Sequence, residues 1–186
     1  MQLSSELFFA SSNTHKFEEV KRILSKLGLE INFSKVTLEE IQSDSLGEIA
    51  KRKAIDAFSR VQKPLIIEDD GLFIDSLNGF PGPYSSYVYD TIGNKGLIRL
   101  LENNQSRNAK FVAIIAYCND VDDVKLFESS ISGKISLSIE DGGWGYDPIF
   151  IPDGETKTYA NVFDKDNLSH RSASLKKFSS WFLHKQ

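Results

Sequence analysis

The sequence has a single cysteine, Cys118, among its 186 residues. One cysteine excludes an internal disulfide and any zinc site that needs several cysteines. Its place in an apolar segment predicts a small buried side chain, and a chain without disulfides suits a reducing cytoplasm. A domain of this length can bury an adequate core without disulfides or a structural metal.

A long apolar segment and an excess of positive charge are also missing. No run of residues approaches the roughly 20 apolar residues that a membrane helix needs. The net charge of −4 argues against a general affinity for nucleic-acid polymers. A small anionic ligand is still compatible with this charge, because a few lysines at one site suffice. We therefore expect a small-molecule substrate, with no nucleic-acid polymer and no membrane as partner.

Short apolar segments and helical patterns alternate early in the chain, and strands that follow one another come later. The predicted strands are residues 7–10, 30–36, 65–67, 110–117 and 124–130, with 131–138 as a continuation. The predicted helices are residues 14–27, a helix that starts at the capping box Ser45-Leu46-Gly47-Glu48, residues 94–101 and residues 172–183. This pattern predicts an α/β fold with a mixed sheet.

The polar segment after the first predicted strand is Ser11-Ser12-Asn13-Thr14-His15-Lys16. Backbone N–H groups at a helix start attract anions, and small hydroxyl side chains let a phosphate approach closely. Lys16 adds a positive charge one turn into the helix. The same residue types are favoured as ordinary helix caps. The segment therefore predicts either a helix cap or a phosphate site.

An acidic run, Glu68-Asp69-Asp70, is predicted at the C-terminal end of the strand over residues 65–67. Ligands of open α/β sheets bind at this edge, and carboxylates are the usual protein ligands of Mg²⁺. Adjacent acids repel one another, and a bound cation would relieve that repulsion. The alternative is a solvated acidic turn before Gly71.

Lys53 is predicted to lie beside the buried stripe of its helix, because Ile49 and Ala57 are its neighbours at i−4 and i+4. A lysine in such a position either extends its ammonium group to solvent or reaches an anion. A phosphate is one candidate anion, and an acidic neighbour such as Glu48 is another.

Glycines and aromatic residues gather in the loop Gly142-Gly143-Trp144-Gly145-Tyr146-Asp147-Pro148. Glycines let the backbone approach a ligand, and Trp144 or Tyr146 offers a flat face that can stack on a base. Loops of this composition also occur without a ligand. Lys165 with Ser169-His170-Arg171 forms a further group of hydrogen-bond donors, for which the alternative is an ordinary helix entrance.

Taken together, these segments resemble the inosine triphosphate pyrophosphatase family over nearly the whole chain. The matching motifs are, in order, Ser11 to Lys16, Glu40-Ile41-Gln42, residues 48–53, Glu68-Asp69-Asp70-Gly71-Leu72, Gly79-Phe80-Pro81-Gly82-Pro83-Tyr84, Gly145-Tyr146-Asp147-Pro148, and Lys165 with Ser169-His170-Arg171. Each motif alone is weak, whereas the set in this order is strong. The resemblance implies a single domain over residues 1–186, with an elongated, mixed, twisted β-sheet, flanking helices and two lobes around a central cleft.

The resemblance also implies an activity: Mg²⁺-dependent hydrolysis of ITP, dITP or XTP to the monophosphate and pyrophosphate by a cytoplasmic homodimer. By position, Glu40 and Asp69 would bind Mg²⁺, and Asp69 would activate the attacking water. The residues implied to bind substrate are Ser11, Ser12, Asn13, Thr14, His15, Lys16, Lys53 and Asp70 around the triphosphate, and Trp144, Gly145, Tyr146, Asp147, Lys165, His170 and Arg171 around the base. Lys165, His170 and Arg171 would read the 6-oxo purine edge.

Three residues depart from the family pattern: Asp70, where relatives often have Ser or Thr, Trp144, where phenylalanine is usual, and Asn161, which replaces a frequent acidic residue. These departures affect fine specificity and leave the reaction in place. Two alternatives to the family activity are a phosphohydrolase for other modified nucleotides and a sensor that binds a nucleotide without cleaving it.

Overall fold

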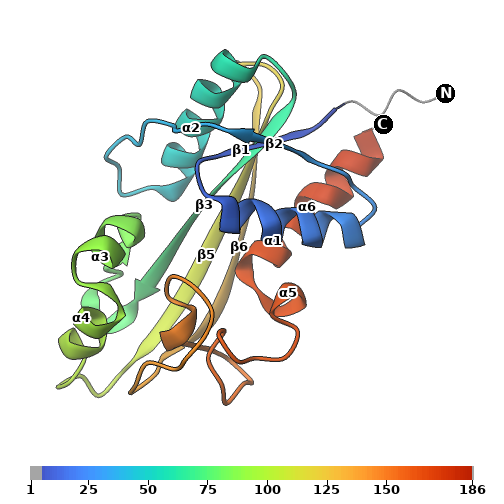
Figure 1. Cartoon of the computed structure of the whole chain (residues 1–186). Helices are drawn as coiled ribbons and strands as arrows, with labels where there is room; N and C mark the ends of the chain where they lie inside the picture. Colours follow the sequence, from blue (N-terminus) through green and yellow to red (C-terminus); the bar gives the residue numbers. More distant parts are fainter. Residues whose placement is uncertain (1–5, 186) are drawn as a thin grey trace. The chain divides into compact units, whose positions relative to one another are not determined.

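A computed structural model describes residues 6–185 of the chain (Figure 1). Its strands are β1 (Phe8–Ser11), β2 (Asn32–Lys35), β3 (Leu65–Ile74), β4 (Pro81–Gly82), β5 (Asn108–Cys118), β6 (Val124–Ile135) and β7 (Phe150–Pro152). Its α-helices are α1 (Thr14–Lys26), α2 (Leu46–Val61), α3 (Ser85–Thr91), α4 (Gly93–Leu100), α5 (Lys165–Leu168) and α6 (His170–Lys185).

The strands form a seven-stranded sheet of order β2-β1-β3-β5-β6-β7, and β4 pairs with β3 off this path. β1 is parallel to β2 and to β3, whereas the β3–β4 and β6–β7 pairs are antiparallel. The predicted α/β fold with a mixed sheet is therefore confirmed.

The chain divides into two compact units. Unit 1 contains the residues up to Asp69, Ala113–Ser129 and the residues from Arg171 onward. Unit 2 contains Asp70–Val112 and Ser130–His170. Because β3, β5 and β6 each contribute residues to both units, each unit has its own part of the sheet and its own apolar core.

In unit 1, α1 and α6 cover one face of the sheet and α2 lies on the other (Figure 1). The apolar core on the first face contains residues of the strands and of both helices, namely Leu7, Phe9, Val20, Ile23, Leu24, Leu29, Ile31, Ile66, Ile115, Tyr117, Leu175, Phe178 and Phe182. On the second face, a side chain placed at Gly47 of α2 would contact Ile114, the neighbour of Ile115. Successive strand residues point to opposite faces, so the helices on the two faces pack against alternate residues of β5.

The core of unit 2 combines the second half of β3 and the first half of β5 with α3, α4 and the segment around β7. Its buried members are Leu72, Ile74, Val88, Leu97, Leu101, Ala109, Phe111, Ile135, Tyr146, Ile149, Phe150 and Tyr159. Four of these are aromatic, and Phe111 contacts the other three rings with centroid separations of 4.8 to 6.5 Å. This cluster fixes the loop that precedes β7.

β3 is longer than the sequence pattern predicts, because it continues past residue 67 to Ile74. Leu72 and Phe73 pair with Gly82 and Pro81 of β4. Gly71 permits this close approach, since a Cβ at that position would lie 2.6 Å from the carbonyl oxygen of Gly82. The prediction that the acidic run lies at the end of a strand is therefore wrong: it lies within β3.

The predicted helix start at Ser45 is confirmed, because its hydroxyl accepts a hydrogen bond from the Glu48 N–H at 3.3 Å. In the other half of the capping box, the Ser43 side chain links the Glu48 carboxylate to the Ser45 N–H. The Glu48 carboxylate accepts from the Ser43 hydroxyl at 2.7 Å, and the Ser43 oxygen accepts from the Ser45 N–H at 3.1 Å. Two free N–H groups at the helix start are thus satisfied.

The C-terminal helix begins earlier than predicted. α6 starts at His170, so His170 and Arg171 lie in its first turn and not before it. The sequence pattern also does not predict α3 and α5, which are short. Cys118 is buried as a free thiol, as predicted, and burial raises the pKa of this thiol.

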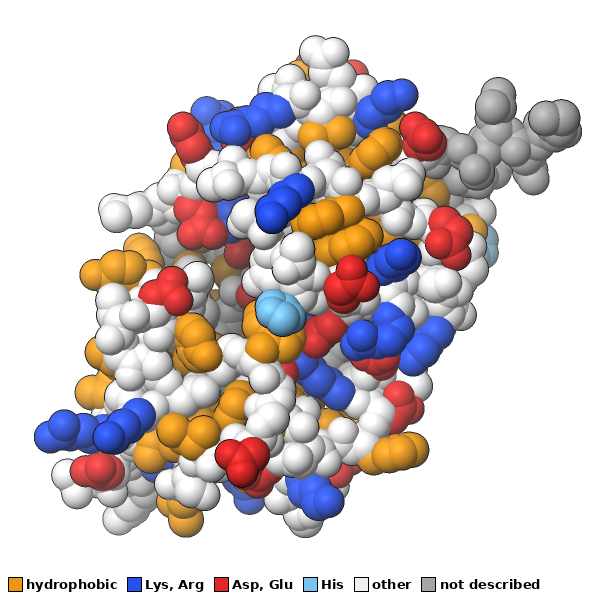
Figure 2. All heavy atoms as spheres, in the orientation of Figure 1, with side chains coloured by type: hydrophobic (Ala, Val, Ile, Leu, Met, Phe, Trp, Pro, Cys, Tyr) orange, Lys and Arg blue, Asp and Glu red, His pale blue; other side chains and the backbone are white. Residues whose placement is uncertain are grey.

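None of the helices in residues 6–185 is both long and apolar enough to span a membrane. Figure 2 shows that acidic and basic side chains are interspersed on the face in view, without a broad field of one sign among the coloured side chains.

Candidate active site

The segment between β1 and α1 is a capped helix start. The Asn13 side chain accepts from the Lys16 N–H at 3.1 Å, and the Ser11 hydroxyl oxygen accepts from the Asn13 N–H at the same distance. Ser12, Thr14 and His15 are exposed around this turn. The helix-cap interpretation is therefore confirmed, and the phosphate role of the same segment stays a prediction.

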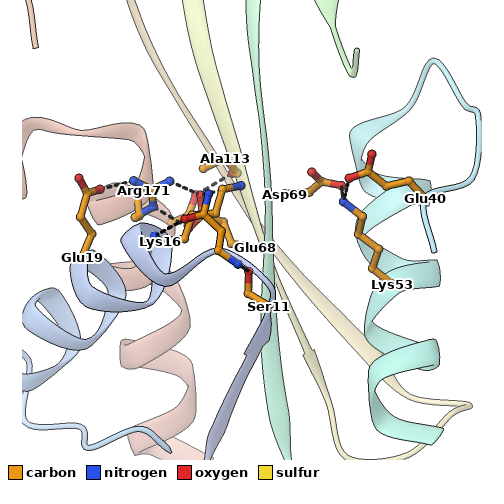
Figure 3. A network of polar contacts seen from close by, with 11 residues as sticks. Ser11, Lys16, Glu19, Glu40, Lys53, Glu68, Asp69, Ala113 and Arg171 are labelled. Atoms are coloured by element: carbon orange, nitrogen blue, oxygen red, sulfur yellow. Dashed lines mark hydrogen bonds and ion pairs between the residues drawn. The ribbon is translucent and has the colours of Figure 1, made fainter. Parts of the chain in front are cut away.

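Glu68 and Asp69 are neighbours in β3, and their side chains point to opposite faces of the sheet (Figure 3). Strand geometry requires this alternation. Glu68 points toward α1 and α6, and Asp69 points toward α2 (Figure 3). The predicted repulsion between these two carboxylates is thus largely relieved by the strand itself, and each carboxylate has its own cationic partner.

Arg171 is the partner of Glu68. Its Nε and Nη2 donate to the two Glu68 carboxylate oxygens at 2.6 and 2.7 Å, and its Nη1 donates to Glu19 (Figure 3). Arg171 is only 2% exposed, and the Glu68 side chain is fully buried. Lys16 adds a longer ion pair, with 3.9 Å between its Nζ and a Glu68 oxygen. The planar fork of arginine suits this two-pronged contact, which a lysine would not reproduce.

These contacts bear on the predicted role of Arg171. The resemblance assigns its guanidinium group to the purine edge, whereas here Glu68 and Glu19 bind its Nε and both Nη atoms. A buried carboxylate that loses its closest cation is strongly destabilised. The geometry therefore supports a role for Arg171 in positioning and neutralising Glu68.

On the other face, the Lys53 ammonium group lies between Glu40 and Asp69 (Figure 3). Its Nζ is 3.1 Å from an Asp69 oxygen and makes a close ion pair with Glu40. The Lys53 and Asp69 side chains are each 12% exposed, and that of Glu40 is 59% exposed. Of the two alternatives given for Lys53, the structure shows contact with anions, namely Glu40 and Asp69, and not extension to solvent. Its contact with phosphate stays a prediction.

The same two carboxylates are the predicted Mg²⁺ ligands. Within residues 6–185, no group of three or more His, Cys, Asp or Glu side chains is arranged to hold a metal. Glu40 and Asp69 nevertheless converge on one positive charge, and both offer the hard oxygen donors that Mg²⁺ prefers. Mg²⁺ usually binds through one or two carboxylates and keeps several waters, so this pair fits the ion.

In unit 2, Asp147 and Lys165 form an ion pair with 2.6 Å between Nζ and a carboxylate oxygen. The same oxygen accepts from the Trp144 N–H at 3.3 Å. Lys165 Nζ also lies 5.8 Å from the ring centres of Trp144 and Tyr159. A cationic donor, an anionic acceptor and an indole ring are thus brought together, and their role in binding a base stays a prediction.

The backbone around this pair is held by contacts that the sequence pattern does not predict. The Asn94 side chain donates to the Gly145 carbonyl oxygen at 2.9 Å, and the Tyr146 hydroxyl donates to the Ser85 carbonyl oxygen at 2.7 Å. Tyr146 is buried, and burial raises the pKa of its hydroxyl group. Trp144, which is less buried, is therefore the better candidate for stacking on a base.

The Ham1 family sequence profile matches residues 7–181. The chain belongs to the Ham1 family. Among relatives of this Ham1 protein, one from Methanopyrus kandleri is 43% identical and covers 95% of this chain and 96% of the relative. One from Pyrococcus horikoshii is 42% identical, with the same coverage. Both relatives are named dITP/XTP pyrophosphatase.

Solved structures of Ham1 proteins share the fold. A HAM1 protein from Coxiella burnetii superposes with a TM-score of 0.83 at 27% identity, covering 97% of this chain and 99% of that one. The dITP/XTP pyrophosphatase from Mycobacterium abscessus superposes with a TM-score of 0.72 at 28% identity, covering 93% and 98%. The predicted family resemblance is thus confirmed over almost the full chain.

In this Ham1 chain, a further group of hydrogen bonds joins Glu140, which precedes the Trp144 loop, to Thr158 and Asn161. The Glu140 carboxylate accepts from the Thr158 hydroxyl at 2.8 Å and from the Asn161 side-chain amide at 2.9 Å. The hydrogen bond from Asn161, and to a smaller extent the one from Thr158, lowers the pKa of Glu140. Asn161 departs from the family pattern and so stands out in the sequence, but its partner Glu140 is 21 residues away and has no signal in the local sequence.

His170 is buried against aromatic rings of unit 2. Its ring stacks on Phe111 with 4.5 Å between centroids and an interplanar angle of 5°, and Tyr159 lies 6.1 Å away. His170 is 4% exposed. The structure therefore brings His170 beside Tyr159, the residue whose ring also lies under Lys165.

Proposed function

We propose that this protein hydrolyses non-standard purine nucleoside triphosphates, namely ITP, dITP and XTP, to the monophosphate and pyrophosphate with Mg²⁺ as cofactor. The observation that carries the proposal is the convergence of Glu40 and Asp69 on a single positive charge in a chain that matches the Ham1 family over residues 7–181. The names of the relatives support the substrate class.

At the phosphate end, unit 1 supplies positive charge and hydrogen-bond donors. We assign the triphosphate to Ser11, Ser12, Asn13, Thr14, His15, Lys16 and Lys53 of unit 1, with Lys16 and Lys53 offsetting its negative charge. Asp70, which follows Asp69 in β3, is assigned to the same end of the substrate. Glu40 and Asp69 would hold the metal, which when bound makes a coordinated water more acidic. Asp69 accepts the proton of the attacking water as it approaches the α-phosphorus, and pyrophosphate leaves. No covalent intermediate is needed.

At the base end, unit 2 supplies a donor, an acceptor and a stacking surface. We assign the base to Trp144, Gly145, Tyr146, Asp147, Lys165 and His170. Lys165 donates to O6 of hypoxanthine or xanthine, and the neighbouring Asp147 carboxylate accepts from N1–H. Adenine presents the opposite pattern at both positions, which leaves buried groups unpaired and allows discrimination of about 10⁴ or more. Arg171 is assigned to this reaction through Glu68, its partner in unit 1.

The homodimer, the cytoplasmic location and the preference for a small-molecule substrate over a polymer or a membrane are also proposals. Size-exclusion chromatography with light scattering tests the first of them: a homodimer should have about twice the monomer mass of 20.9 kDa.

Incubation with ITP, XTP, ATP and GTP in the presence of Mg²⁺ tests the activity. We expect monophosphate and pyrophosphate from ITP and XTP, with far less product from ATP. Release of diphosphate and orthophosphate would assign the protein to another class of phosphohydrolase. Binding without any product at all magnesium concentrations would identify a nucleotide sensor.

A further inference from the structure

We propose that Lys53 competes with the divalent cation for Glu40 and Asp69, and thereby makes metal binding depend on the nucleotide. The inference rests on the proposed function, in which these two carboxylates hold Mg²⁺ and the substrate is a triphosphate. It goes further, because it assigns Lys53 two alternative partners: the carboxylates when no nucleotide is bound, and phosphate when one is.

The position of the Lys53 ammonium group carries this inference. It contacts both carboxylates at once, from one turn on the inner side of α2 (Figure 3). Lys53 and Asp69 are both mostly shielded from water, since each side chain is 12% exposed. Shielded charges interact more strongly than charges on the surface. A divalent ion at the same oxygens would therefore repel the ammonium group and must displace it from at least one of them.

Displacement leaves Lys53 in need of another anion. Lys53 lies four residues from Ile49 and four from Ala57, two buried residues of α2, so its side chain leaves the helix beside the buried face. A triphosphate supplies such an anionic partner. Nucleotide binding thus removes the competitor from the carboxylates, and metal binding frees the lysine for phosphate.

Such coupling is reciprocal, because two ligands that affect each other's affinity do so by the same factor. In the free protein the divalent cation should bind weakly. In the presence of a nucleotide it should bind more tightly, by a factor in the range of about 5 to 150 that is usual for coupled sites. Removing the Lys53 charge should strengthen metal binding to the free protein and abolish much of this coupling.

Mn²⁺ tests the inference, because carboxylate sites that suit Mg²⁺ also accept it and its free form is measured directly by electron paramagnetic resonance. Mn²⁺ is titrated into the wild-type protein and into Lys53→Met and Lys53→Gln variants, with and without α,β-methylene ITP, which resists cleavage. Lys51→Met is the matched control, because Lys51 lies on the exposed side of the same helix. Thermal melts establish that each variant is folded.

Without nucleotide, we expect both Lys53 variants to bind Mn²⁺ about tenfold more tightly than wild type. The analogue should raise the Mn²⁺ affinity of these variants only slightly. It should raise the Mn²⁺ affinity of wild type and of Lys51→Met strongly. Equal Mn²⁺ affinity in wild type and the Lys53 variants would overturn the inference while leaving the proposed function intact. Absence of Mn²⁺ binding in every protein, with or without the analogue, would overturn the proposed metal site and the inference together.

Discussion

In unit 1 the candidate residues contact one another mainly through charge, whereas in unit 2 they lie among aromatic rings and backbone hydrogen bonds. Lys53 with Asp69 and Arg171 with Glu68 are ion pairs with little exposure to water. In unit 2 the ion pair of Lys165 with Asp147 lies beside the Trp144 and Tyr159 rings.

Under the proposed function, this difference corresponds to the two ends of a nucleotide. The triphosphate is the same in all nucleoside triphosphates and is recognised by charge, while the bases differ in hydrogen-bonding pattern and shape. Substitutions in unit 1 should therefore affect all nucleotides by a similar factor. Substitutions in unit 2 should change the ratio between ITP and ATP.

The largest expected effect is that of Asp69→Asn. The substitution removes the proton acceptor and one charge from the proposed metal site, so ITP turnover should fall at least about 10³-fold, given that a general base contributes ~10²–10⁴. ATP and ITP turnover should fall by the same factor, which steady-state kinetics with both substrates measures.

Stability separates a catalytic from a structural role for this aspartate. Because Glu68 points to the opposite face, relief of repulsion in Asp69→Asn is small, and the lost contact to Lys53 dominates (Figure 3). Lys53 keeps Glu40 as a partner, and so unfolding free energy should fall by only about 1 to 3 kcal/mol. A variant that is much less stable yet retains turnover would show that Asp69 is structural.

Arg171→Ala should have the largest effect on stability. It leaves the fully buried Glu68 carboxylate without its two-pronged partner, and breaking such a pair from one side costs about 3 to 5 kcal/mol. Chemical denaturation measures this loss. Lys16, which lies 3.9 Å from Glu68, offsets part of it.

The same variant decides between the two roles considered for Arg171. Positioning of Glu68 predicts that ITP and ATP turnover fall by the same factor at a temperature where the variant is folded. A smaller ratio of ITP turnover to ATP turnover would instead support the base-reading role that the family resemblance implies. It would also weaken the proposal that unit 1 recognises charge and unit 2 recognises the base.

Local patterns predict much of the frame of unit 1. The cap at Ser45 and the helix that follows it depend on residues within one or two turns, where sequence spacing is informative. The same spacing places Lys53 beside the buried stripe of α2, where contact with an anion is one of two alternatives. The identity of the anion was not predictable, because Asp69 reaches Lys53 only when β3 and α2 pack together.

Contacts between distant segments account for what the sequence did not reveal. Arg171 and Glu68 are 103 residues apart, so no spacing rule connects them. The extension of β3 depends on pairing with β4 through Gly71 and Gly82. The local pattern ends the strand at residue 67, and only a strand that continues through the acidic run places Glu68 and Asp69 on opposite faces.

The smallest expected effect is that of Asn161→Asp in unit 2, where the hydrogen bond to Glu140 becomes a contact between two carboxylates. Ala160, the residue before Asn161, donates its N–H to the Asp147 carbonyl oxygen at 3.2 Å, so a shift of this turn should disturb the base-binding pair. Because exposed charges interact weakly, we expect the KM for ITP to rise only about two- to fivefold with kcat little changed.

Exchanging the two groups tests whether the Glu140–Asn161 contact itself is responsible. In the double variant Glu140→Gln with Asn161→Asp, the amide and the carboxylate change places and the hydrogen bond returns, so KM should recover. Trp144 fluorescence, measured in a Trp181→Phe background, should shift in the single variant and return in the double variant.

The rise in KM that we expect for Asn161→Asp should also depend on pH. Hydrogen bonds lower the pKa of Glu140 in the folded protein, so their stabilisation is present at neutral pH and is lost as the pH falls through that pKa. In Asn161→Asp the two facing carboxylates repel each other and so take up a proton more readily than Glu140 does in the wild-type protein. The repulsion therefore weakens at a higher pH than the one at which wild-type Glu140 is protonated, and the variant should approach wild type as the pH falls. A KM that stays high in the double variant would show that Asn161 acts on the loop by a route other than Glu140.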